Sequence, residues 1–301
     1  MKKVALALAS GGPRGFAYIG AIEELQRRGY TITSVAGASA GALVGGIFAA
    51  GGMAPFKKWL CNLDPVQVMS LMDPSFSVSS LVKGERVIEE IKKRVPEVDI
   101  EDLPIPFTAV ASDLYTGEEV LFREGPLFTA IRASISIPSM FKPVTWQGRT
   151  LVDGGMVNTF PLNRVARTEG DILVGFNVNE IDAALIQGFL DSRSALQEQR
   201  KDKGLLERIG LDLQERKMEA DGREGWIPVD AGDNMGSILQ RSFGIMNSAI
   251  ARMGIALTPP DILVSLPYDS YHGVYGYSHA PEIIEKGRLL MAEALNRYEK
   301  G

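Results

Sequence analysis

A pentapeptide of the form G-x-S-x-G, running from Gly37 to Gly41 with Ser39 at its centre, has the clearest chemical meaning in the sequence. The apolar run Ile32–Ala36 predicts a strand, and Ala40–Ala50, rich in Ala, Leu, Val and Ile, predicts a helix. A sharp strand-to-helix turn exposes the serine Oγ above the sheet, where it can attack a carbonyl carbon. We therefore expect Ser39 to be a nucleophile; an incidental serine in a glycine-rich turn is the alternative interpretation.

A second glycine-rich segment, Ser10–Gly15, follows a short apolar run and opens a predicted helix. Glycines let backbone N–H groups face a ligand without a Cβ in the way, and a helix N-terminus favours negative charge. Because Pro13 has no N–H, the expected donors to an oxyanion are the N–H groups of Gly11, Gly12 and Arg14. A phosphate-binding loop is the alternative, although the segment lacks the G-x-G-x-x-G spacing and the Walker Lys-Ser/Thr pair.

The expected general base is Asp153, which ends a predicted short strand and is followed by Gly154 and Gly155. A carboxylate with its ordinary pKa of about 4 is a poor base toward a serine hydroxyl. Burial would raise that pKa, because desolvation disfavours the charged form. The alternative is a turn aspartate that accepts hydrogen bonds from its own backbone.

His272 and His279 are the two histidines of the chain. The order Ser, Asp, His would suit a hydrolase triad. However, His272 lies in a segment rich in Tyr and Gly, and His279 directly precedes a predicted helix, so we expect His279 to be a capping or supporting residue. Asp102, Asp113 and Asp171 are rival carboxylates, of which Asp113 and Asp171 are expected to be structural because they lie at a hairpin turn and a strand start.

The elements that must position these residues alternate between strand and helix: strand 4–9, helix 14–28, strand 32–36 and helix 40–50. This alternation predicts a parallel sheet, and the loops that follow its strands meet at one edge. The segment Pro55–Ser80 is expected to be irregular. Further strands are predicted over 106–111, 119–122, 150–152, 171–178 and 261–266, and further helices over 84–94, 126–137, 236–257 and 281–298.

The composition is that of a soluble globular protein of 301 residues with 45% hydrophobic residues. A net charge of −5 argues against a nucleic-acid surface. The single cysteine, Cys61, cannot form an intrachain disulfide. The apolar run Val4–Ala9 is too short for a signal peptide, and no run approaches the ~18 residues of a membrane span. We therefore expect a cytoplasmic protein.

One domain is expected over residues 1–301. Within it, residues 180–225 carry interspersed charges of both signs, with Gly and Asp interrupting the helical pattern. This segment is interpreted as a charged helical or flexible excursion rather than a second core.

Three motifs taken together resemble those of the patatin-like phospholipase family: Ser10-Gly11-Gly12-Pro13-Arg14-Gly15, Gly37-Ala38-Ser39-Ala40-Gly41 and Asp153-Gly154-Gly155. A further block is similar to another family segment: Arg132-Ala133-Ser134-Ile135-Ser136-Ile137-Pro138 with Phe141-Lys142-Pro143. Ser10 stands where plant patatins have Gly, a pattern similar to that of small bacterial members.

The resemblance implies an α/β fold of three α/β/α layers with a mostly parallel central sheet. It also implies a Ser-Asp dyad without a catalytic histidine. The implied site residues are Ser39 as nucleophile, Asp153 as base, Gly11, Gly12 and Arg14 as the oxyanion loop, and Gly15, Gly37, Gly41 and Gly154 as supporting glycines. Ser134 and Ser136 lie on a predicted helix without an elbow and are assigned to packing or substrate-side support.

The expected function is hydrolysis of fatty acyl esters of lipids (as by a phospholipase A, a lysophospholipase or a lipid acyl hydrolase) through an acyl-enzyme intermediate, with no metal or cofactor. Pro55–Phe76, rich in large apolar residues, is expected to form an acyl-chain channel or lid, or else ordinary core. Lys57 and Lys58 beside aromatic residues indicate a peripheral membrane contact. A thioesterase, a broad short-chain carboxylesterase and a non-catalytic regulatory protein on the same fold are the alternatives.

Overall fold

The computed structural model describes residues 2–72, 81–138, 140–182, 235–271 and 276–300, together with Ala184 and Gln187. The excursion expected over 180–225 lies outside the described residues except at its start, and it stays a prediction. Within the described residues no helix is both long enough and apolar enough to cross a membrane.

The described strands form one sheet of eight strands, in the order β5-β6-β3-β2-β1-β7-β8 with β4 paired to β3. Their bounds are β1 Lys2–Leu8, β2 Tyr30–Ala38, β3 Phe107–Asp113, β4 Glu119–Phe122, β5 Val144–Trp146, β6 Arg149–Asp153, β7 Ile172–Glu180 and β8 Ile262–Pro267. The five strands from β3 to β8 along this order are parallel, and β4, β5 and β6 pair antiparallel. The sheet is therefore mostly parallel, as the alternation of strand and helix predicts.

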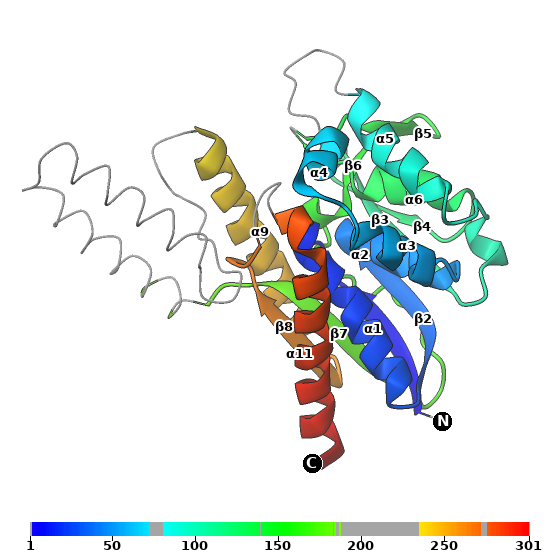
Figure 1. Ribbon diagram of the computed structural model, residues 1–301, viewed down its shortest axis with the longest axis vertical. Coiled ribbons are helices and arrows are strands. Elements are labelled where there is room, and N and C mark those ends of the chain that lie inside the picture. Colours follow the sequence, from blue (N-terminus) through cyan, green and yellow to red (C-terminus); the bar gives the residue numbers. More distant parts are fainter. Residues whose placement is uncertain are drawn as a thin grey trace, which may run out of the picture.

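The helices are α1 Ala17–Arg27, α2 Ala40–Ala49, α3 Met53–Leu60, α4 Pro65–Met72, α5 Leu81–Lys92, α6 Leu127–Ser134, α9 Met235–Leu257 and α11 Ala280–Lys300. Short 3₁₀ turns are η1 Gly12–Phe16, η2 Ile100–Asp102, η3 Gly154–Met156 and η5 Tyr277–His279. Figure 1 shows α1 and α11 lying side by side across the sheet. The positive φ of 78° at Gly29 ends α1, as its position after the predicted helix indicates.

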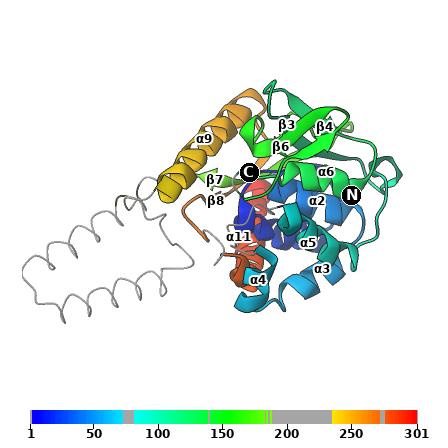
Figure 2. The ribbon, with the colours of Figure 1, turned by 90° about the horizontal axis from the view of Figure 1, so that it is seen from above.

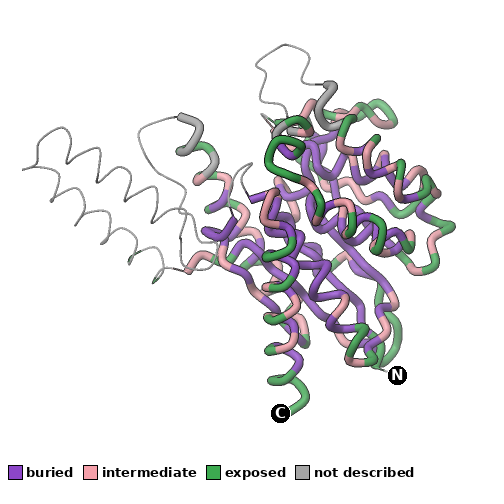
Figure 3. The backbone as a smooth tube through the Cα atoms, in the orientation of Figure 1, coloured by how far each residue is buried: buried purple, intermediate pink, exposed green. Residues whose placement is uncertain are grey.

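Strand β1 has a large-residue face and a small-residue face, and this alternation produces the layers. Val4, Leu6 and Leu8 point into the main core with α1, α2 and α11. The intervening alanines, Ala5 and Ala7, point to the other face. There they pack against Phe160 and against Ala251, which belongs to α9. Helices therefore cover both faces of the sheet (Figure 2), and the buried backbone concentrates in the strands and the sheet-facing helix sides (Figure 3). The expected three-layer α/β/α fold is confirmed.

Two local predictions are wrong. The segment Pro55–Ser80 was expected to be irregular, but within the described part α3 and α4 occupy most of it. Pro65 is tolerated because it starts α4, where its missing N–H has no intrahelical partner. Strand β5 was not anticipated; it forms a hairpin with β6 through a two-residue turn at Gln147 and Gly148, whose φ values are 47° and 77°.

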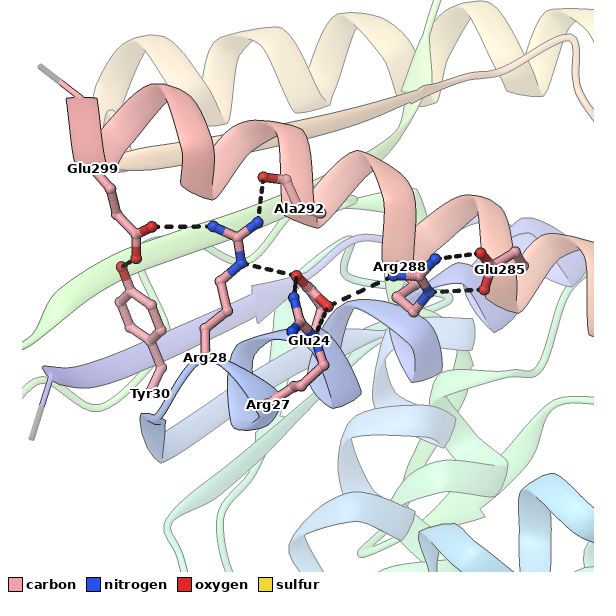
Figure 4. A network of polar contacts seen from close by, with 8 residues as sticks. All are labelled: Glu24, Arg27, Arg28, Tyr30, Glu285, Arg288, Ala292 and Glu299. Atoms are coloured by element: carbon pink, nitrogen blue, oxygen red, sulfur yellow. Dashed lines mark hydrogen bonds and ion pairs between the residues drawn. The ribbon is translucent and has the colours of Figure 1, made fainter.

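The contact between α1 and α11 is built around the buried carboxylate of Glu24 (Figure 4). Arg27 Nη2 lies 2.7 Å from Glu24 Oε1, and Arg28 Nε lies 2.8 Å from the same oxygen. Arg288 of α11 approaches the other oxygen at 3.9 Å, and Arg28 Nη1 reaches Glu299 of α11 at 3.0 Å. The hydrogen bond from Arg27 is the main cause that lowers the pKa of Glu24 to about 2.

This network predicts the effect of Glu24→Gln on stability. A carboxyl group whose pKa is lower in the folded state stabilises the fold above its unfolded pKa, and this contribution is lost as the pH falls through the folded value. We expect the variant to lose roughly 1–2 kcal/mol of unfolding free energy at pH 7. The loss should narrow from about pH 4.5 toward about pH 2. Urea unfolding at stepped pH values measures it.

The matched control is Glu285→Gln, which removes an exposed partner of Arg288 on the same helix pair and should change stability little. A Glu24→Gln defect that is the same at pH 7 and pH 3 would show that the loss comes from packing and not from charge.

Candidate active site

Ser39 lies at the corner between β2 and α2, with a backbone that most residues avoid. Its φ of 52° and ψ of −118° place a non-glycine residue in a strained region. The turn is tight on both sides: a Cβ on Gly37 would lie 2.2 Å from the carbonyl carbon of Gly41, and one on Gly41 would lie 2.2 Å from the carbonyl oxygen of Leu8. Both motif glycines are thus required by close approach, and the turn has the geometry of a nucleophile elbow.

A buried hydroxyl anchors this elbow from α6. The Ser39 N–H donates to Ser134 Oγ at 2.8 Å, and Ser134 Oγ donates to the Val110 carbonyl at 2.6 Å. Ser136 lies nearby, where its Oγ donates to the Arg132 carbonyl at 2.8 Å. Both serines are fully buried. Sequence reasoning assigned Ser134 to packing or substrate-side support and missed that it fixes the backbone of the nucleophile, because no motif indicates which element packs on the elbow.

The register of β3 brings Asp153 to Ser39. Val110 of β3 is paired with Ala38, the residue before Ser39, and the next residue, Ala111, is paired with Asp153. Two residues more than a hundred positions apart therefore meet at one point of the sheet. Because β6 runs antiparallel to β3, Asp153 approaches Ser39 from a strand of the opposite direction and not from the carboxyl end of a parallel strand.

The backbone of Asp153 is held on both sides. Its N–H donates to the Ser136 carbonyl at 3.0 Å, and its carbonyl accepts a bond of 2.8 Å from Ser112 Oγ. A Cβ on Gly154 would lie 2.1 Å from the Val110 carbonyl oxygen, so the chain can turn here only with a glycine. These contacts fix the direction of the Asp153 side chain.

The carboxylate of Asp153 is buried, and only one of its two oxygens has a hydrogen-bond partner among the described residues. Oδ1 accepts a 2.7 Å hydrogen bond from the Gly155 N–H, whereas Oδ2 has no hydrogen-bond partner among the described residues. Desolvation raises the pKa of Asp153 to about 6, and the nearby Ser39 hydroxyl and the Gly155 N–H oppose this rise. The Ser39 hydroxyl lies close enough to lower the pKa of the carboxylate. It does not form a hydrogen bond to Oδ2. Catalytic hydrogen bonds are often long before substrate binds.

The loop after β1 presents its N–H groups at the start of η1, where Gly12 has a φ of 56°. The first N–H groups of a helix have no intrahelical acceptor, which leaves those of Gly11 and Gly12 for a ligand. Arg14 is the third residue of η1, and the expectation that its N–H joins the oxyanion donors stays a prediction. Its buried side chain binds the carbonyls of Val178 and Tyr268, at 3.0 and 2.8 Å.

The glycine loop, Ser10–Gly15, is held in place by hydrogen bonds between backbone groups at its start and other parts of the chain. The Ala9 carbonyl accepts a 2.6 Å bond from the Tyr18 hydroxyl, and the Ser10 carbonyl accepts a 2.7 Å bond from Asn179 Nδ2. The Ser10 N–H donates to the Thr159 carbonyl at 2.8 Å. Donors held in this way need not reorganise when charge develops, which is the requirement for an oxyanion site.

An apolar cavity of about 790 Å³, its open mouth included, begins at Ser39 and Gly12. Its other lining residues come mainly from α2, α3 and α4 and from the segments after α6 and before α11: Phe16, Ala40, Leu43, Val44, Trp59, Leu60, Leu63, Val68, Leu71, Val87, Ile135, Ile137, Phe141 and Tyr277. Within Pro55–Phe76, Phe56 is buried in the core, whereas Trp59, Leu60 and Leu71 line the cavity. An acyl-chain channel or lid stays a prediction.

His279, the one histidine among the described residues, lies apart from this arrangement. His279 ends η5, where its Nδ1 lies 3.4 Å from Ser278 Oγ, and it does not line the cavity around Ser39. This position agrees with the expected capping or supporting role. His272 lies outside the described residues.

Two of the three rival aspartates, Asp113 and Asp171, have structural contacts, and the third, Asp102, is an exposed residue at the end of η2. Asp113 accepts hydrogen bonds from the N–H groups of Tyr115 and Thr116, and the Tyr115 bond is the main cause that lowers its pKa. Asp171 is bound by the Thr168 N–H and by the guanidinium of Arg167. Both are turn residues, as their positions predict.

Comparisons with known proteins show the family of the chain. A family model described as patatin-like phospholipase matches residues 6–166. An uncharacterized NTE family protein of Mycobacterium tuberculosis (strain H37Rv) is 35% identical over 333 residues, which cover 99% of this chain and 92% of the relative. Lysophospholipase NTE1 of Candida albicans is 26% identical over 196 residues, covering 64% of this chain and 14% of that protein. The chain therefore belongs to the patatin-like phospholipase family.

Proposed function

We propose that the protein is a serine hydrolase that cleaves fatty acyl esters of lipids, with Ser39 as nucleophile and Asp153 as general base. The observation that carries the proposal is the buried Oδ2 of Asp153, which has no hydrogen-bond partner among the described residues and lies near Ser39, a residue that lines the apolar cavity. Membership of the family supports the reaction class, and the printed name of the Candida relative, a lysophospholipase, supports the substrate class.

The reaction begins when Ser39 Oγ attacks the ester carbonyl carbon and its proton passes to Asp153 Oδ2. The carbonyl electron pair moves to the oxygen, which the N–H groups of Gly11 and Gly12 stabilise. The bond to the leaving alcohol then breaks, and the proton on Asp153 passes to the departing oxygen. Water repeats the sequence on the acyl-enzyme, with Asp153 taking its proton, and releases the fatty acid.

A carboxylate can serve as base here because of its surroundings. Its ordinary pKa of 3.8 would leave it a poor acceptor for a hydroxyl proton, and desolvation raises that pKa to about 6. A base works best when its pKa lies near the working pH, so the shift improves proton transfer.

The cavity indicates the acyl part of the substrate. Its lining side chains are almost all apolar, and a lipid acyl chain gains about 0.8 kcal/mol for each methylene group that it buries. Because the cavity opens directly at Ser39, an acyl chain lying in it places its ester carbonyl at the nucleophile.

The first prediction from the proposed function concerns covalent labelling. A fluorophosphonate probe should label the wild type at Ser39, and Ser39→Ala should abolish the label. Asp153→Asn should slow labelling and ester hydrolysis by about 10³-fold or more, because the isosteric amide cannot accept the proton. Gel fluorescence and peptide mass spectrometry measure it.

His279→Ala and His272→Ala serve as controls and should keep substantial activity. A folded wild-type protein that the probe does not label would favour a non-catalytic regulatory role, and an inactive but folded His279→Ala would restore a histidine-dependent triad. Faster turnover of acyl thioesters than of lipid esters would favour the thioesterase alternative.

The second prediction concerns pH. Only the ionised form of Asp153 can accept the proton, so kcat/KM should fall tenfold per pH unit below about pH 6 and level off above it. Initial rates from pH 4.5 to 8.5 on a water-soluble ester measure this profile. An inflection near pH 7 that disappears in His279→Ala would contradict the carboxylate base.

The third prediction concerns chain length. Leu71→Gln puts a polar amide into the cavity wall, so kcat/KM for a long-chain p-nitrophenyl ester should fall about tenfold, while that for the butyrate ester changes little. Val66→Gln is the matched control, because Val66 lies on the same helix, is 77% exposed and does not line the cavity. Equal losses on both esters would contradict an acyl-chain channel.

A further inference from the structure

Tyr277 lies over the glycine loop although no sequence motif points to it. It begins η5 and lines the same cavity as Ser39 and Gly12. A Cβ built on Gly12 would lie 3.7 Å from the Tyr277 hydroxyl oxygen, so the phenol oxygen stands next to the backbone of this loop. The hydroxyl therefore borders the space in which the proposed oxyanion would form.

The ring of Tyr277 is positioned by η1, the turn that carries Gly12. It packs edge-on against Phe16, with ring centroids 5.7 Å apart and planes at 73°. The preceding Gly276 lies against η1 as well: a Cβ there would lie 2.8 Å from Pro13 Cγ and 2.4 Å from the Tyr271 carbonyl oxygen. The phenol and the glycine loop thus form one packed unit, and their relative placement is fixed before a ligand arrives.

The hydroxyl of Tyr277 is a donor that the described residues leave available. Among them no hydrogen bond involves it; the charges of Arg14 and Asp153 act on it only through space. Burial raises the pKa of Tyr277 to about 12, so the phenol stays protonated at neutral pH. The Tyr277 side chain is half-buried, and its protonated phenol offers an O–H to an acceptor.

We propose that Tyr277 is a further catalytic residue, which donates a hydrogen bond to the oxyanion formed when Ser39 attacks an ester carbonyl, beside the N–H groups of Gly11 and Gly12. This inference rests on the proposed hydrolase function. Tyr277 keeps its proton throughout: the proton of Ser39 moves to Asp153 and then to the leaving alcohol, while the phenol only shares its O–H with the charged oxygen. The bond strengthens as charge develops, so it acts on kcat rather than on ground-state binding.

The test is Tyr277→Phe, which removes the hydroxyl and keeps the ring that packs on Phe16. We expect kcat for ester hydrolysis to fall about 10- to 100-fold with KM within about twofold, since single oxyanion donors commonly contribute 10²–10³ and a lone phenol at the cavity mouth contributes less. The rate of fluorophosphonate labelling should fall in parallel, because the probe's phosphoryl oxygen occupies the same site. Tyr30→Phe is the control: Tyr30 bonds Glu299 away from the cavity and should leave kcat unchanged.

Two outcomes would overturn the proposal while Ser39 is still labelled in the wild type. One is that kcat and KM are both unchanged in Tyr277→Phe, and the other is a raised KM with kcat unchanged, which would make Tyr277 part of the cavity wall only. A thermal unfolding midpoint equal to that of the wild type separates these results from misfolding. If the wild type is neither labelled nor active, the hydrolase function itself fails, and the role of Tyr277 fails with it.

Discussion

The strained turn at Ser39 is the constraint on which the site depends. Residues with positive φ and a side chain persist only where the surroundings hold them. Here three contacts do so: the backbone contact between Gly37 and Gly41, the approach of Gly41 to the Leu8 carbonyl, and the hydrogen bond from the Ser39 N–H to Ser134. Because the last two join the elbow to β1 and α6, a change in either neighbour would move the nucleophile.

The proposed general base, Asp153, lowers the free energy of unfolding when it is ionised. Its pKa is higher in the folded than in the unfolded protein, so ionised Asp153 destabilises the fold, by roughly 3 kcal/mol at neutral pH. Elsewhere the buried carboxylate of Glu24 is fully bound by Arg27 and Arg28 and its pKa is lowered. Desolvation raises the pKa of both acids, but the outcomes are opposite. Glu24 is surrounded by cations, whereas Oδ2 of Asp153 has no hydrogen-bond partner among the described residues.

The sequence predicted those parts of the site whose requirements are local. The glycines around Ser39 and after Asp153 are needed for close backbone approach, so they can be recognised in a motif. Strand β5 could not be recognised, because three residues carry no periodicity and the hairpin turn defines it. The roles of Ser134 and Tyr277 depend on which distant elements pack together, and no residue near them in the chain reports that contact.

Strand β1 is paired on one side with β2, which follows soon along the chain, and on the other with β7, which comes far later. Closing a short loop costs less entropy than closing a long one, so we expect the pairing with β2 to form before the pairing with β7. In that order the elbow at Ser39 would form before Thr159 and Val178 reach the glycine loop and hold it. A chain folded to that stage would hold Ser39 in its elbow without the contacts that complete the glycine loop.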